Sequence, residues 1–199
     1  MRRDRRGATI VEFAIISPVM LLMMMGLGDL LYQVYTQSVL NGAVQKAARD
    51  SGIEGGAAIT TTIDSNVISI ITPLVKNLVL NCSTPAVKST WCSKRESYDS
   101  FSEVAPEPFV DTNGNGIRDP GECFTDENGN GTWDADPGIT GQGGASAVTL
   151  YTMTITYPRL FPFAKLFGAS TTQTISATSL LKNQPYATQT TNTNVTVCT

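Results

Sequence analysis

Residues 7–31 read GATIVEFAIISPVMLLMMMGLGDLL, and Glu12 is the one charged residue of this run before Gly28. At about 1.5 Å per helical residue, the run is long enough to cross a bilayer core of about 30 Å. Four arginines among the first six residues predict a cytoplasmic amino end by the positive-inside rule. We therefore expect a transmembrane helix over residues 8–31 in an inner membrane, with the remaining chain periplasmic or on the cell surface.

Glu12 needs a physical reason, because an acid at the centre of a membrane helix costs about 2.5–3.5 kcal/mol and is a functional hypothesis by default. The alternative is that Glu12 lies near enough to Arg6 to snorkel to the interface. The residues around it favour a functional role.

Basic residues followed by Gly7, and then Glu12 and Phe13, resemble the class III signal of type IV prepilins. This resemblance implies cleavage between Gly7 and Ala8 by a prepilin peptidase, which makes residues 1–7 a leader. It also implies that Glu12, at the fifth mature position, neutralises the new amino terminus of a neighbouring subunit.

The wider pattern is more specific. RGATIVEFA at residues 6–14, Pro18, and GLGD at residues 26–29 look like the TadE/TadG-type pilin-like proteins of tight-adherence (Flp) pili. Some TadE-like proteins are processed and others are not, so this wider resemblance is compatible with a cleaved or an uncleaved chain.

The composition argues against catalysis and nucleic-acid binding. The chain contains no histidine, which removes Ser-His and Cys-His pairs, so we expect no enzyme. The formal net charge is −3, and loss of residues 1–7, with four Arg and one Asp, would make it more negative by three. An acidic chain is a poor partner for phosphates, so we expect no nucleic-acid binding.

Four cysteines, an even count in an exported chain, predict disulfides. They allow three connectivities, and we favour a short loop closed by Cys82 and Cys92, with Cys123 paired to Cys198. No C-x-x-C spacing is present, so metal binding and redox exchange are weaker interpretations.

Helical periodicity continues beyond the membrane. An apolar stripe runs to Arg49, and glycines at residues 52–56 end the helix. Asp29 is expected to be a solvated interfacial acid, with contact to a partner subunit as the alternative. Residues 59–79 predict a second amphipathic helix that breaks at Pro73 and packs in the core rather than crossing the membrane.

Residues 111–122 form the most specific local motif outside the membrane helix, and we call them the first acidic loop. They match the twelve-residue calcium loop of EF-hands, with Gly116 at the sharp turn. The candidate ligands are Asp111, Asn113, Asn115, the carbonyl of Ile117, Asp119 and Glu122. Prolines on both sides oppose the flanking EF-hand helices.

Residues 126–137, the second acidic loop, repeat this pattern fifteen residues later. Its candidate ligands are Asp126, Asn128, Asn130, Thr132, Asp134 and Asp136. The twelfth position is Pro137, so Asp136 is expected to substitute or the site to be weaker. A flexible Asn-Gly linker is the alternative, but residues 99–136 hold ten of the seventeen acids and one base, Arg118. Such repulsion favours Ca²⁺, one or two ions, in a structural role.

The carboxyl third predicts strands. Residues 81–108 are expected to be a loop with at most one short strand, whereas residues 147–157 and 171–181 predict two antiparallel strands. An apolar connector over residues 160–167 joins them, and residues 188–199 predict a last strand held by Cys198.

We therefore expect an α+β protein: a long amino-terminal transmembrane helix, then a pilin-like head with a second helix and an antiparallel β-sheet. The expected divisions are residues 1–7, 8–31, 32–108, 109–138 and 139–199. The expected function is a minor pilin or pilus-assembly component that contacts other pilin subunits and the assembly platform. The alternative is an uncleaved, membrane-anchored, calcium-dependent adhesion or envelope-contact protein.

Overall fold

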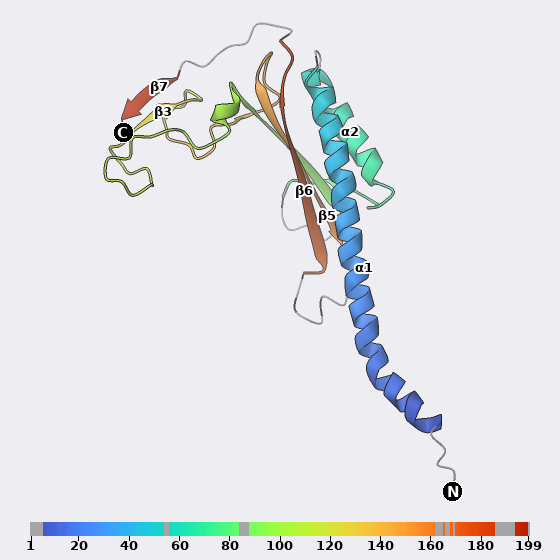
Figure 1. Cartoon of the computed structure of the whole chain (residues 1–199). Helices are drawn as coiled ribbons and strands as arrows, with labels where there is room; N and C mark the ends of the chain where they lie inside the picture. Colours follow the sequence, from blue (N-terminus) through green and yellow to red (C-terminus); the bar gives the residue numbers. More distant parts are fainter. Residues whose placement is uncertain are drawn as a thin grey trace. The chain divides into compact units, whose positions relative to one another are not determined.

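A computed structural model describes residues 6–53, 56–83, 88–161, 165, 168, 170–185 and 194–198. It confirms the α+β class (Figure 1). The elements in chain order are α1 (Arg6–Ser51), the 3-10 helix η1 (Gly56–Ile59), α2 (Thr60–Ile71), β1 (Val79–Leu80), β2 (Thr90–Tyr98), the 3-10 helix η2 (Phe101–Glu103), β3 (Cys123–Asp126), β4 (Ile139–Thr140), β5 (Val148–Pro158), β6 (Thr172–Lys182) and β7 (Val195–Cys198).

The larger sheet has the order β1-β2-β5-β6, with β4 paired to β2. β1 and β2 are parallel, whereas β2 and β4 are antiparallel, so the sheet is mixed. β5 and β6 are antiparallel, because the partner number falls as the strand number rises in the hydroxyl pairs Thr152–Thr178, Thr154–Ser176 and Thr156–Thr174. β3 and β7 form a separate antiparallel pair.

The chain divides into two compact units, and α1, α2, β2, β5 and β6 contribute residues to both. The first unit comprises residues 1–40, 71–92 and 154–176. One face of α1 is buried within it at Asp29, Thr36 and Leu40, spaced so that they follow one side of the helix. Strand residues of β5 and β6 with the same burial, Ile155, Tyr157 and Ile175, complete this core.

The second unit comprises residues 41–70, 93–153 and 177–199. Small residues on α1 allow close approach of α2, whose Ile63 and Val67 are 2% and 1% exposed (Figure 1). The buried apolar residues of α1 in this unit are Ala43, Val44, Ala47 and Ala48. The break predicted at Pro73 is confirmed, because α2 ends at Ile71.

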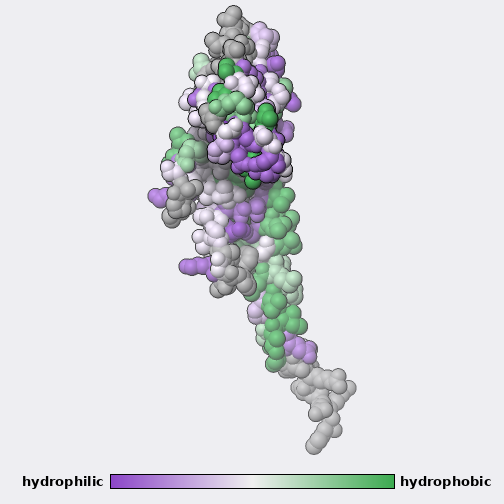
Figure 2. All heavy atoms as spheres, turned by 90° about the vertical axis from the view of Figure 1, so that its left-hand side faces the viewer, coloured by the Kyte–Doolittle hydropathy of each residue, from purple (hydrophilic) through white to green (hydrophobic). Residues whose placement is uncertain are grey.

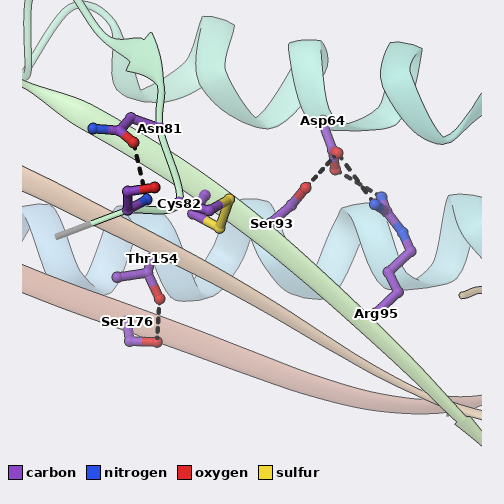
Figure 3. The surroundings of a disulfide bond; sticks show 9 residues. Asp64, Asn81, Cys82, Ser93, Arg95, Thr154 and Ser176 are labelled. Carbon is purple, nitrogen blue, oxygen red and sulfur yellow. Dashed lines mark hydrogen bonds and ion pairs between the residues drawn. A yellow bond between two sulfur atoms is a disulfide. The ribbon is translucent and has the colours of Figure 1, made fainter. Parts of the chain in front are cut away.

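The expectation of at most one short strand within residues 81–108 is wrong, because β2 is nine residues long and lies between β1 and β5. Its sequence, TWCSKRESY, is too polar to predict a central strand. Tertiary contacts override that composition: Asp64 of α2 accepts hydrogen bonds from Ser93 and Arg95 of β2, as Figure 3 shows.

The predicted carboxyl-terminal elements are present where the structure describes them. β5 and β6 correspond to the strands expected over residues 147–157 and 171–181. β7 covers only Val195–Cys198 of the last expected strand, and residues 186–193 lie outside the described part. Most of the predicted connector, residues 162–164 and 166–167, also lies outside it.

Candidate functional site

The first acidic loop is organised by Asp111. Its Oδ1 accepts the N–H of Gly114 at 2.7 Å, and its Oδ2 accepts the N–H of Gly116 at 2.8 Å. Both glycines have positive φ angles, 74° and 77°, which a side chain would strain. These backbone N–H groups, that of Gly116 foremost, hold the pKa of Asp111 below its ordinary value.

Asp119 collects the asparagine side chains of the same loop. The Nδ2 groups of Asn113 and Asn115 donate to Asp119 Oδ2 at 2.7 and 2.8 Å. The Oδ1 atoms of both asparagines accept backbone N–H groups two residues further on, including that of Ile117, whose side chain is exposed. Hydrogen bonds therefore hold the Asp and Asn side chains of the first acidic loop close together along one short turn.

The second acidic loop repeats this arrangement. Asp126 accepts the N–H groups of Gly129 and Gly131, both at 2.7 Å, and Asp134 Oδ2 accepts the amides of Asn128 and Asn130. Thr132 donates its N–H and its hydroxyl to Asn130 Oδ1. The repeat found in the sequence is therefore also a repeat in three dimensions.

Carboxylates alone are too few in each loop to surround a hard cation. Within the described residues, no group of three His, Cys, Asp or Glu side chains is placed to hold a metal ion. A cation in either loop would thus also need amide and backbone carbonyl oxygens, which Ca²⁺ accepts. Carboxylate and amide side chains alternate along the sequence in both loops.

Glu122 closes the first loop. Its side chain is largely buried, and its two oxygens accept the N–H groups of Thr112 at 2.7 Å and Asp119 at 2.9 Å. The expected substitute in the second loop, Asp136, instead accepts the hydroxyl of Tyr98 at 2.7 Å and the N–H of Gly138 at 3.2 Å. Burial and then this hydrogen bond raise the pKa of Tyr98.

Glu107 is a buried acid that the sequence does not point out. It precedes both loops, and its oxygens accept the N–H groups of Glu127 and Asp134, both at 2.9 Å. No spacing rule marks it, because it lies outside the twelve-residue repeat. Its flanking prolines, Pro106 and Pro108, are the one unusual feature of its surroundings in the sequence.

A disulfide and short strands support the base of the loops. The two disulfides are Cys82–Cys92 and Cys123–Cys198, the pairing favoured from the sequence. Cys123 and Cys198 are register partners of β3 and β7, and Phe109 forms a bridge to Phe124 of β3. β3 is therefore held on one side by β7 and on the other by the segment that precedes the first loop.

A second candidate site is the amino-terminal part of α1. Exposed apolar side chains cover it, and Figure 2 shows them as a nearly continuous apolar surface. By length and composition α1 can cross a membrane, and no residue of its most apolar window is buried. Glu12 and Phe13 are both exposed on this surface, and Gly7 and Ala8 lie in the first turn of α1.

Asp29 is not a solvated acid, so that expectation is wrong. It is 6% exposed, and Arg159, the residue after β5, donates to its Oδ2 at 2.7 Å. The partner lies 130 residues away in the sequence, which is why local patterning could not reveal it. The pair ties α1 to the residue that follows β5.

Residues 7–49 match the family model of the TadE-like proteins. This segment coincides with most of α1 and confirms the resemblance that the sequence motifs predicted at the amino end. The match indicates a protein associated with the tight-adherence pilus system and carrying a membrane-anchoring helix. No curated protein and no solved structure matches the chain.

Proposed function

We propose that this protein is a minor pilin or pilus-assembly component of a tight-adherence type IV pilus. The observation that carries the proposal is the TadE-like match over an apolar helix whose amino-terminal surface is exposed and contains one acid, Glu12. An exposed apolar helix surface is stable in lipid or against other helices. The proposed role is structural rather than catalytic.

Glu12 has a defined task in this proposal. Cleavage between Gly7 and Ala8 by a prepilin peptidase would create a positively charged α-amino group at Ala8. The carboxylate of Glu12 in a neighbouring pilin subunit would neutralise it inside the bilayer, where an unpaired acid is costly. The amino end of the precursor would be cytoplasmic, and the residues after α1 would be periplasmic or on the cell surface.

The proposed head is stabilised by Ca²⁺, bound first of all in the first acidic loop. Asp111, Asn113, Asn115, Asp119 and Glu122 would supply side-chain oxygens, and Ile117 its carbonyl. The ion would offset the mutual repulsion of the acids and rigidify the loop, which suits a subunit that works outside the cytoplasm.

The test is the intact mass and amino-terminal sequence of the protein recovered separately from membranes and from sheared surface material. A chain that begins at Ala8 in the sheared fraction is the expected result. A chain that begins at Met1 and stays in membranes would overturn the pilin proposal and leave a membrane-anchored calcium-binding protein for adhesion or envelope contact.

Two variants of the same helix sharpen the test. Glu12→Gln keeps the size of the side chain but removes the charge, so we expect normal processing with depletion from the sheared fraction. Ser17→Ala, which removes a polar group without changing charge, is the control and should behave as the unmodified chain. Equal recovery of both variants in sheared material would refute the role given to Glu12.

A further inference from the structure

The second acidic loop has no carboxylate at its twelfth position. The two loops are offset by fifteen residues, so Pro137 stands where Glu122 stands in the first loop. In a calcium loop, the glutamate at this position binds the ion through both oxygens and closes the site. A loop without it has lost its strongest ligand unless another part of the chain supplies one.

Glu122 shows which contacts the closing carboxylate makes in this protein. Its Oε1 accepts the N–H of the second loop residue, Thr112, and its Oε2 accepts that of the ninth, Asp119. The two hydrogen bonds, 2.7 and 2.9 Å long, fix the carboxylate against the backbone of the loop that it closes.

Glu107 makes the same two contacts in the second loop. Its Oε1 accepts the N–H of the second residue, Glu127, and its Oε2 accepts that of the ninth, Asp134, both at 2.9 Å. These are the residues that correspond to Thr112 and Asp119 after the shift of fifteen. Glu107 therefore occupies the place of a twelfth-position glutamate, although it comes nineteen residues before the loop begins.

The backbone of Glu107 is fixed in this place. Its N–H donates to the carbonyl of Asp134 at 3.0 Å, and its own carbonyl accepts the indole N–H of Trp133 at 2.8 Å. The neighbouring carbonyl of Pro108 accepts the N–H of Thr125 at 2.8 Å, next to the second loop. The side chain thus reaches the loop from a segment that is tied to it on both sides.

The negative charge around Glu107 favours binding of a cation. Glu107 is 1% exposed, Asp126 is 4% exposed, and within the described residues neither forms an ion pair with a basic side chain. Oε2 of the adjacent Glu127 is buried without a hydrogen-bond partner in the same described part of the chain. Buried carboxylates that have no counter-charge are costly, and a bound cation removes that cost.

We propose that Glu107 is the closing ligand of the second acidic loop, so that this loop also binds a divalent cation of the size of Ca²⁺. The inference rests on the proposed binding of calcium by this protein. It replaces Asp136, which is engaged with Tyr98, as the carboxylate that completes the second site. Since Glu107 precedes the first loop, the second site forms only after residues 107–110 have docked beside β3.

The experiment measures ion stoichiometry on the full chain in detergent micelles with both disulfides formed, by calorimetric titration with Ca²⁺. We expect two ions per chain for the unmodified protein. Glu107→Gln should weaken one site by about 10- to 100-fold, because ligand charge tunes calcium affinity over several decades. Glu122→Gln should weaken the other site to a similar extent, and Asp136→Asn should leave both sites unchanged.

Luminescence of Tb³⁺ identifies which site is lost. Trp133 lies within the second loop, and the other tryptophan, Trp91, lies in β2. Emission sensitised by Trp133 should therefore shift to higher Tb³⁺ concentration in Glu107→Gln but not in Glu122→Gln. A Trp133→Phe variant, which removes the sensitiser and keeps the ligands, gives the background emission.

The possible outcomes separate the two proposals. Absence of Ca²⁺ binding by the unmodified chain would overturn calcium binding itself, and this inference with it. Binding of one ion, abolished by Glu122→Gln, would overturn only the assignment of Glu107, whether or not the Glu107 variant folds. Two ions retained in Glu107→Gln would do the same, and Glu107→Asp, which keeps the charge, should bind at the second site more tightly than Glu107→Gln.

Discussion

Asp64 is the residue whose replacement should destabilise the second unit most clearly. Its carboxylate accepts hydrogen bonds from Arg95 at 2.7 and 3.1 Å, from the hydroxyl of Ser93 at 2.7 Å and from that of Tyr151 at 2.7 Å. The side chains of Asp64 and Arg95 are each 9% exposed and point toward each other in Figure 3. The Arg95 guanidinium lies 4.3 Å from the centre of the Tyr151 ring.

Asp64→Asn keeps the shape of the side chain but leaves the buried Arg95 without its counter-charge. Breaking one side of a buried ion pair costs about 3–5 kcal/mol, and we expect a loss in the free energy of unfolding of that size. The control is Lys94→Met, which lies next to Arg95 in β2. It breaks the ion pair of Lys94 with Glu96, in which the lysine side chain is 59% exposed. An exposed pair contributes about 0–1 kcal/mol.

Urea unfolding of the full chain in micelles, followed by tryptophan fluorescence, measures the effect. With a slope of about 2–3 kcal/mol per molar urea, the midpoint of Asp64→Asn should fall by about 1–2 M. Adding Arg95→Met should restore part of the loss, because the uncompensated charge is then removed. A loss below about 1 kcal/mol for Asp64→Asn would refute the reasoning.

The same group predicts a dependence on pH. Burial raises the pKa of Asp64, but the hydrogen bonds from Arg95, Tyr151 and Ser93 together with the charge of Arg95 outweigh it, so the folded pKa lies below the unfolded one. The stabilisation is then fully present above the unfolded pKa, about 4, and is lost as the pH falls through the folded pKa. Urea midpoints measured from pH 7 downwards should fall less steeply in this acid range for Asp64→Asn than for the unmodified chain.

Three further predictions concern the other links in the structure. The double variant Cys123→Ser with Cys198→Ser removes a disulfide that joins residues 75 positions apart in the sequence. The free energy of unfolding should fall by about 4 kcal/mol by the chain-entropy estimate. The urea midpoint should fall accordingly, and an unchanged midpoint would contradict this prediction. Arg159→Met leaves Asp29 buried without its partner and should cost about 1.5–3 kcal/mol, with a matching fall in Tm, whereas an unchanged Tm would show that the pair contributes little. Ca²⁺ at about 100 times its Kd should add about 2.7 kcal/mol to the free energy of unfolding. EDTA should remove that gain, and Asp111→Asn should reduce it. A Tm that does not respond to Ca²⁺ in any variant would contradict calcium binding by the acidic loops.

Local patterns were sufficient for the features that depend on neighbouring residues. The long apolar run predicted α1, the glycines at residues 52–56 its end, and Pro73 the end of α2. Alternation of β-branched residues predicted β5 and β6. Each of these signals acts within a few residues, through backbone geometry or through the period of apolar side chains.

The acidic loops were also predicted from local sequence, because the repeated Asp and Asn residues of each loop lie within twelve consecutive residues. The structure repeats the same hydrogen bonds in both loops, which spacing alone could only suggest. The pairing of four cysteines needed the fold as well, since three connectivities were open until β3 and β7 were seen as partners.

The sequence by itself therefore determined the membrane helix, the α+β class and the two acidic loops, because each is written in contiguous residues. Only the tertiary structure decided the partners of isolated charges: Asp29 with Arg159, Asp64 with Arg95, and Glu107 with the second loop. A charged residue carries no local sign of its partner. The cost of burying it is offset only when the fold brings an opposite charge or backbone N–H groups to it, and these can come from any distance along the chain.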